Sequence, residues 1–138
     1  MSSLLEVYIK ADGYIFASPV YEGFITALMK KFLERKIALG YRQKDAYRKI
    51  GTARTPASFK KMASMIVTAN CSDEYEEAMG IPSFEAMESH LVVEQVPTVD
   101  RYYVGSLEDM TEETFSNRLD KAYQLGIHLV EEIEKAQK

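Results

Sequence analysis

The sequence contains a single cysteine, Cys71, among its 138 residues. One cysteine excludes a disulfide within the chain and any metal site built from several cysteines. Basic residues are also few, because 17 lysines and arginines stand against 21 acidic residues and give a formal charge of −4. A nucleic-acid-binding surface is normally basic, so this balance argues against that class of protein. We expect a reduced, cytoplasmic setting.

Long apolar runs are missing as well. No stretch approaches the roughly 20 residues that a membrane-spanning helix needs, and the first ten residues lack the apolar core of a signal peptide. Internal repeats and low-complexity segments are not found either. Apolar residues nevertheless make up 46% of the chain, which is typical of a globular protein with a buried core. We expect one domain over residues 1–138 that binds neither membranes nor nucleic acid.

The most informative stretch is residues 11–35. Its apolar run Tyr14–Ala17 predicts a buried strand, which should end at Pro19 because proline cannot donate to a strand ladder. Gly23 allows a tight turn, and after it apolar residues recur at helical spacing up to about residue 38. The predicted unit is strand, tight loop and helix. Its loop lies at the carboxyl end of the strand, where ligands bind in open α/β sheets.

The same stretch matches the pattern A-D-G-I-I-x-G-S-P-V-Y-F-G-S-x-S-A-x-L-K-x-F-x-D-R without gaps. The matching residues are Ala11, Asp12, Gly13, Ile15, Ser18, Pro19, Val20, Tyr21, Gly23, Ala27, Lys30, Phe32 and Arg35. It departs from the pattern at Ala17 (usually Gly), Glu22 (usually aromatic), Phe24 (usually Ser) and Glu34 (usually Asp). The stretch thereby resembles the third strand, flavin-ring loop and third helix of the NADPH-dependent FMN reductase and iron–sulfur flavoprotein family.

This resemblance implies a flavodoxin-like three-layer α/β sandwich with parallel strands in the order 2-1-3-4-5. The strands in this chain would correspond to strands 3, 4 and 5. The first two β–α units, which carry the Ser/Thr/Gly-rich phosphate loop, are expected to be missing, so the chain would be a partial, truncated domain. In the iron–sulfur members the cluster cysteines lie in that same part. The resemblance therefore implies no cluster here.

Later elements continue the α/β order. Met62–Ala69 predicts a second buried strand, followed by a turn and by a helix that stops at Gly80 and restarts at Pro82. Leu91–Val96 predicts a third strand, with residues 97–106 irregular. Residues 43–50 predict a short helix and residues 51–56 a loop. Thr111 should cap a last helix whose apolar stripe comprises Phe115, Leu119, Ala122, Gly126, Leu129 or Val130, and Ile133.

The resemblance also implies a site for FMN at two strand ends. The implied cofactor-binding residues are Ser18, Pro19, Val20, Tyr21, Gly23, Thr68, Ala69 and Asn70. Backbone N–H groups would meet the flavin ring and Tyr21 would form an aromatic wall. NAD(P)H would be the co-substrate, and a small molecule would accept the electrons. The cofactor carries this chemistry, so we assign no catalytic side chain and no metal ligand. Turn chemistry alone explains Asn70 equally well.

Two functions stay open. One is an FMN-dependent NAD(P)H oxidoreductase that transfers hydride through the bound flavin. The other is a non-catalytic α/β assembly or interaction module that has lost its flavin, which the missing phosphate loop, Glu22 and the turn Asn70-Cys71 favour. A lost strand 1 would leave the apolar first strand with an unpaired edge. We expect a second subunit of a homo-oligomer, a partner chain or a rearranged segment to cover that edge. Cys71 is interpreted as a small buried apolar residue.

Overall fold

The computed structural model describes residues 2–36, 40–41, 52–53 and 60–138. Its main sheet has four strands in the order β2-β1-β5-β6. β1 pairs with β5 and β5 with β6 in parallel, whereas β1 and β2 form an antiparallel hairpin. The strands are β1 Gly13–Tyr21, β2 Phe24–Ile25, β5 Met62–Thr68 and β6 Thr98–Val104, with a separate short pair β3 Gly40–Tyr41 and β4 Thr52–Ala53.

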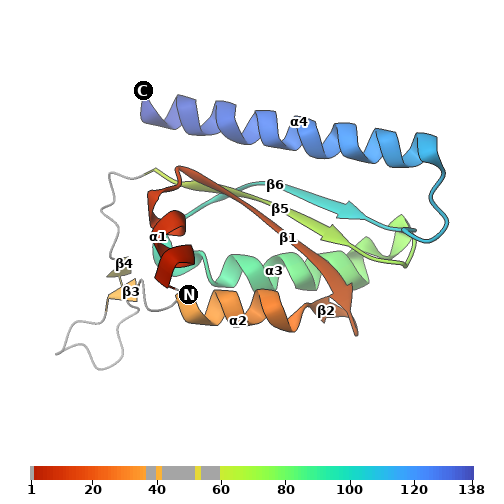
Figure 1. Cartoon of the computed structure of the whole chain (residues 1–138), viewed down its shortest axis with the longest axis horizontal. Coiled ribbons are helices and arrows are strands. Elements are labelled where there is room, and N and C mark those ends of the chain that lie inside the picture. Colours follow the sequence, from red (N-terminus) through yellow and green to blue (C-terminus); the bar gives the residue numbers. More distant parts are fainter. Residues whose placement is uncertain (1, 37–39, 42–51, 54–59) are drawn as a thin grey trace.

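Helices cover both faces of this sheet. α1, α2 and α3 lie on one side and the long helix α4 crosses the other side (Figure 1). The helices are α1 Ser2–Lys10, α2 Ala27–Lys36, α3 Ile81–Ser89 and α4 Glu112–Gln137, with short turns η2 Asp73–Tyr75, η3 Glu76–Gly80 and η4 Val92–Glu94. The three layers confirm the predicted flavodoxin-like α/β class. Within the described residues, no helix is long and apolar enough to cross a bilayer.

The side chains of β1 point alternately to the two faces of the sheet, and these faces differ in burial. Tyr14 and Phe16 are buried on the side of α1 and α2, where the Tyr14 ring stacks on Tyr8 with centroids 4.1 Å apart. Ile15 and Ala17 point to the opposite face and are exposed, Ile15 by 50%. The apolar run therefore forms a strand as predicted, but only its face toward α1 and α2 is fully buried by the described chain.

The predicted end of this strand at Pro19 is wrong. β1 continues to Tyr21, because Val20 and Tyr21 pair with Ile25 and Phe24 of β2. The helix that follows consequently begins at Ala27 instead of directly after Gly23. Thr26 marks its start, since its hydroxyl accepts a hydrogen bond from the Met29 N–H at 3.2 Å, as an N-cap does.

The predicted third strand at Leu91–Val96 is also wrong. That segment forms η4, and Gln95 reverses it with a φ of 56°. Its apolar character reflects burial of Leu91 and Val96 in the core. The strand lies instead at β6, in the stretch predicted to be irregular.

Two further predictions concern the helices and the middle of the chain. Gly80 does not stop a helix, because it has a right-handed φ of −76° between η3 and α3. The helix predicted at residues 43–50 lies outside the described residues, as does most of the loop predicted at 51–56.

α4 begins as predicted, but only part of the predicted stripe, Leu129 and Ile133, is buried. The Thr111 hydroxyl accepts a hydrogen bond from the Thr114 N–H at 3.1 Å. Leu125, Leu129 and Ile133 are buried against the sheet, whereas Phe115 and Leu119, at the start of the predicted stripe, are 53% and 54% exposed. The described chain therefore leaves one apolar side of α4 uncovered.

A buried polar network organises the end of the sheet where β1 and β5 begin. Lys36, the last residue of α2, is 1% exposed and donates to the carboxylate of Glu94 and to the carbonyl oxygen of His90 at 2.7 Å. The Tyr8 hydroxyl donates to the same carboxylate at 2.7 Å, and the Tyr14 hydroxyl donates to the Tyr8 carbonyl at 2.8 Å. Burial is the main cause that lowers the pKa of Lys36. The network joins α1, α2, β1 and η4.

Lys61 anchors the end of α1 in the same region. It is 5% exposed, and its amine donates to the carbonyl oxygen of Ile9 at 2.5 Å and to that of Ala11. The last carbonyls of a helix have no partner within the helix. A cation at this place both satisfies them and suits the negative end of the helix dipole.

At the other end of the sheet, the loop after β6 crosses the turn after β5 at close range. A Cβ on Gly105 would lie 2.5 Å from the Cys71 carbonyl oxygen and 2.7 Å from the Asp73 nitrogen. The Gly105 N–H donates to the Asp73 carboxylate at 2.9 Å, and the Ser106 N–H donates to the Cys71 carbonyl at 2.8 Å. Only glycine fits this crossing, which fixes the turn. Cys71 itself is half-exposed, so its predicted burial is wrong.

Removing one partner of the buried ion pair should strongly destabilise the fold. We expect Lys36→Met to lower the free energy of unfolding by about 3–5 kcal/mol, because the Glu94 carboxylate stays buried without its cation. Urea unfolding followed by circular dichroism measures the loss. The double variant Lys36→Met/Glu94→Gln should recover part of it. The exposed pair Lys135–Glu132 supplies the control Lys135→Met, with an unchanged midpoint. An unchanged midpoint for Lys36→Met itself would contradict this account.

Adding a methyl group at Gly105 should disturb the crossing. We expect Gly105→Ala to cost about 1–3 kcal/mol of unfolding free energy, because backbone atoms cannot yield to the new Cβ. Gly13→Ala is the matched control, since the atom in its way is the tip of the Ile133 side chain, which can rotate. Thermal unfolding of both variants checks this. Equal losses would show that the crossing is no tighter than the Gly13 site.

Candidate functional site

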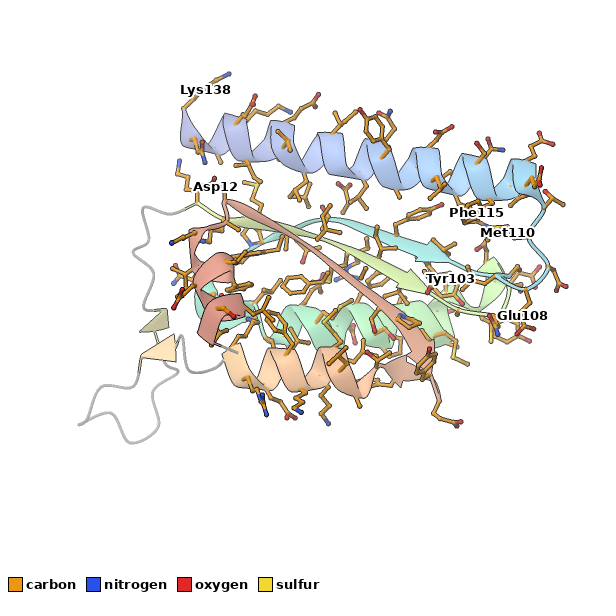
Figure 2. The ribbon with its side chains drawn as sticks, in the orientation of Figure 1. Asp12, Tyr103, Glu108, Met110, Phe115 and Lys138 are labelled. Atoms are coloured by element: carbon orange, nitrogen blue, oxygen red, sulfur yellow. The ribbon has the colours of Figure 1, made fainter. Side chains whose placement is uncertain are left out.

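The two predicted groups of site residues meet at one end of the sheet. Parallel pairing of β1 and β5 sets Ser18 beside Val67 and Pro19 beside Thr68. The hairpin after β1 and the turn after β5 are therefore neighbours, at the carboxyl ends of adjacent parallel strands. Glu108 lies at this end of the molecule and Asp12 at the opposite end (Figure 2). This is the part of an open α/β sheet where ligands bind.

The tip of the hairpin is a two-residue turn. Glu22 and Gly23 have φ angles of 52° and 78°, and two positive φ values are characteristic of the type I′ turn that joins twisted strands. The Tyr21 side chain beside it is 67% exposed, whereas Pro19 and Val20 are half-buried. An exposed aromatic ring next to a rigid backbone turn offers a flat apolar surface to a ligand.

Two of the predicted site residues, Ser18 and Ala69, use their polar groups in hydrogen bonds within the fold. Ser18 is 2% exposed, and its hydroxyl accepts a hydrogen bond from the Thr26 N–H at 3.1 Å. Ala69 is 5% exposed, and its N–H donates to the Val104 carbonyl at 2.9 Å. Their side chains point away from solvent. Of the predicted set, Pro19, Val20, Tyr21, Gly23, Thr68 and Asn70 keep at least part of their surface accessible.

The turn after β5 is tied to the loop after β6 and to α4. The Asn70 amide donates to the Glu108 carboxylate at 2.7 Å. Asp73 is ion-paired with Arg118 of α4. The hydrogen bond that the Arg118 guanidinium donates to Asp73 is the main cause that holds the pKa of this carboxyl below its usual value. Asp73 lies at the start of η2, yet its carboxylate is used for this long-range pair. It pins the turn to α4, so the second half of the site rests on long-range contacts.

A long apolar groove begins at the hairpin. Its volume is about 1070 Å³, and it follows β1 from Tyr21 and Pro19 to Leu4 and Val7 of α1, with Leu28 along its α2 wall. Among the described residues that line it, none has a carboxylate, ammonium or guanidinium group. A groove of this kind accepts an apolar or aromatic body.

These features fit one part of FMN and not the other. The aromatic wall of Tyr21, the type I′ turn and the start of the groove fit the flat isoalloxazine ring. A phosphate dianion is served less well, because Glu22 and Glu108 bring carboxylates to this end and Arg118 is already paired with Asp73. The described residues at this end thus suit a flat aromatic ring better than they suit a phosphate.

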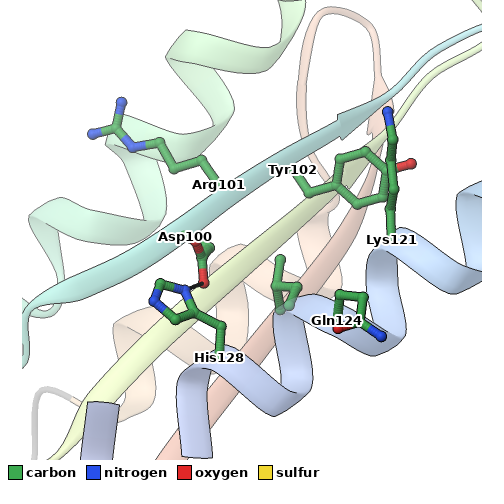
Figure 3. Close-up of a pocket in the computed structure, with 7 residues that line it drawn as sticks. Asp100, Arg101, Tyr102, Lys121, Gln124 and His128 are labelled. Carbon is green, nitrogen blue, oxygen red and sulfur yellow. Dashed lines mark hydrogen bonds and ion pairs between the residues drawn. The ribbon is translucent and has the colours of Figure 1, made fainter. Parts of the chain in front are cut away.

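A second, smaller hollow lies between β6 and α4. Its volume is about 300 Å³, and the Asp100 carboxylate accepts a hydrogen bond from the His128 ring at 2.9 Å (Figure 3). Arg101 turns to the other side of the strand, where it pairs with Glu88. His128 is 48% exposed, and the described part of the chain contains no cluster of three metal-ligating side chains. A partly exposed hydrogen-bonded pair between β6 and α4 accounts for the polar side chains of this hollow.

Sequence reasoning missed three residues that shape the site. Thr26 sets the start of α2, and a capping threonine one position before an apolar helical pattern was the available signal. Gly105 and Glu108 lie in a stretch with no regular pattern, and their contacts join positions more than 30 residues apart. No local signal in the sequence could have shown those contacts.

Several solved structures share this fold. A flavone reductase matches with a TM-score of 0.71 at 19% identity, covering 96% of this chain and 46% of its own. A thermophilic tryptophan halogenase from Streptomycin violaceusniger matches with a TM-score of 0.62 at 17% identity, over 93% of this chain and 72% of its own. A candidate quinone reductase from Klebsiella pneumoniae matches with a TM-score of 0.58 at 20% identity, over 96% and 52%.

Identities this low show the fold alone, and the activities named for these proteins differ. The chain spans about half the length of the flavone reductase and of the candidate quinone reductase. Among curated proteins, none matches the chain. A model of the NADPH-dependent FMN reductase family matches residues 1–72, which contain α1, the hairpin, α2 and β5. With more than half of its length matched by that model, the chain belongs to the NADPH-dependent FMN reductase family.

Proposed function

We propose that the chain is the flavin-ring half of an FMN-dependent NAD(P)H oxidoreductase. The observation that carries this proposal is the juxtaposition of the Tyr21–Gly23 hairpin with the strand end at Thr68, in a chain of the FMN reductase family. Bound FMN would supply hydride transfer from NAD(P)H to a small-molecule acceptor such as a quinone. The protein's share is then binding, orientation and exclusion of water.

Each accessible residue has a part in that arrangement. The exposed Tyr21 ring would stack against the flavin ring. The type I′ turn presents backbone N–H groups at a fixed angle, since two adjacent residues with positive φ leave it little freedom. Pro19, Val20 and Thr68 would line the floor of the flavin site, and Asn70, whose amide is held by Glu108, would close its far side. Ser18 and Ala69 act indirectly, by fixing the two backbones.

A second function has specific support. The acidic residues Glu22 and Glu108 and the absence of a phosphate cradle in the described residues favour an assembly or interaction module that keeps the scaffold without the flavin. In that case the hairpin is a structural turn only. The two functions differ in a property that is simple to measure, namely saturable binding of FMN.

Titration of FMN with the purified chain tests the proposal. We expect saturable quenching of flavin fluorescence in the micromolar range, because the ring platform is preformed. Tyr21→Ala should weaken binding by about 3- to 10-fold, the loss expected for one aromatic contact. Tyr75→Ala is the matched control, because Tyr75 is similarly exposed and lies in η2.

The remaining outcomes discriminate between the functions. Binding that saturates, together with oxidation of NAD(P)H by the loaded protein, supports the oxidoreductase. If FMN fluorescence stays constant at protein concentrations of hundreds of micromolar, the oxidoreductase assignment fails for this chain and the assembly module takes its place. Equal weakening by both tyrosine variants would place the flavin elsewhere.

A further inference from the structure

One edge of the main sheet is open in the part of the chain that the structure describes. β2 pairs only with Val20 and Tyr21, so β1 from Gly13 to Pro19 has no neighbour on the side away from β5. Residues Gly13–Tyr21 carry no charge. Exposed sheet edges usually carry charged side chains that discourage pairing. The edge strand β6 follows that rule, with Asp100 and Arg101.

Apolar hollows flank this edge on both faces of the sheet. The groove toward α1 and α2 exposes Val7 by 66% and Leu28 by 79%. A second hollow of about 430 Å³ lies between β1 and α4. Its lining is mainly apolar, with Ile15, Gly126 and Val130, and also includes the polar residues Asp12, Glu134 and Gln137. The two hollows share Gly13, Tyr14 and Ile15. Whatever pairs with the edge must therefore also bring apolar side chains to both faces.

The sequence of α4 indicates what kind of element packs beside it on its face of the sheet. Gly126 is in the middle of this 26-residue helix, where glycine is unfavourable. A Cβ there would meet nothing within 4 Å in the described chain, so the chain itself gives no reason for a glycine. The exposed Leu119 and Val130 lie along the same side. A glycine flanked by apolar residues allows a second helix to approach closely.

We propose that this edge is the interface with a second copy of the chain, related by a two-fold axis at Ile15. β1 would pair antiparallel with β1 of the partner subunit, and the two α4 helices would pack side by side at Gly126. A two-fold interface requires a self-complementary surface. The edge has one, since the small residues Gly13 and Ala17 stand two positions to either side of Ile15 and would face each other across the axis.

The ends of the edge fit this arrangement. Pro19 has no N–H and β2 begins beside Val20, so the shared ladder is confined to residues 13–17. Antiparallel overlap about Ile15 brings the end of α1, with Lys10, near the hairpin of the partner subunit, with Glu22. These charges have opposite sign, whereas an arrangement with β1 strands in the same direction would set like ends together.

Sedimentation velocity from about 1 to 100 µM tests the interface. The wild type should be a dimer at the upper concentrations. Ile15→Lys should raise the dissociation constant at least 10-fold, because it puts a charge at the axis. Gly126→Leu should do the same while leaving the subunit folded, since its side chain has free space in the single chain. Val92→Lys, at an exposed apolar residue of η4, is the control and should not change it.

Two results would overturn the proposal. A monomer at 100 µM would leave the edge to another polypeptide or to a further segment. A dimer that Ile15→Lys and Gly126→Leu both leave intact would use another surface. Neither result depends on FMN, so this proposal and the flavin-binding proposal fail or survive separately.

Cysteine cross-linking tests the position of the axis. In a Cys71→Ser background, Ile15→Cys should form an intersubunit disulfide on mild oxidation, because residues on the axis face each other within disulfide reach. Ala17→Cys should not, since the two copies of residue 17 would lie four residues apart along the ladder, roughly 13 Å. The reverse pattern would move the axis to Ala17 and refute the stated register.

Discussion

Burial of the Lys36 charge is the constraint on which the rest of the structure depends. An ammonium group removed from water is stable only with partners that satisfy it, and Glu94 and the His90 carbonyl supply them. Because these partners come from the segment after α3, the requirement draws that segment against α2. The Tyr8 hydroxyl shares the same carboxylate, so α1 is held in place by the same pair. Buried hydrogen bonds and the Lys36–Glu94 ion pair thus hold together the elements around the amino ends of β1 and β5.

The two ends of the sheet consequently differ in character. At the amino end, polar groups are buried and bonded to one another, which gives a rigid base. At the carboxyl end, the hairpin and the turn after β5 keep accessible backbone and side chains. Contacts among Gly105, Asp73 and Arg118 hold the turn after β5 in place. A family whose cofactor carries the chemistry needs such a fixed platform more than it needs catalytic side chains.

The sequence predicted the parts that local pattern determines. The strand at Tyr14, the strand at Met62, the cap at Thr111 and the α/β class were right, because apolar runs and capping residues act over short distances. The third strand was misplaced because Leu91–Val96 is apolar for tertiary reasons, as core residues beside α3. Within the site, Pro19 and Thr68 are neighbours because they lie at the ends of adjacent parallel strands. The roles of Ser18 as a structural hydroxyl and of Glu108 as a partner of Asn70 depend on the folded chain.

The contrast between the two edges of the sheet has a consequence for solubility. A sheet with two bare edges can add copies without limit and grow into fibres. Here the outer strand β6 carries Asp100 and Arg101, which discourage addition on that side, while β1 is uncharged. In the proposed dimer, pairing at β1 would end after a single step, because a two-fold contact uses up the β1 edge of both copies. The difference in charge between the two edge strands would then limit the sheet to two copies and prevent open-ended growth.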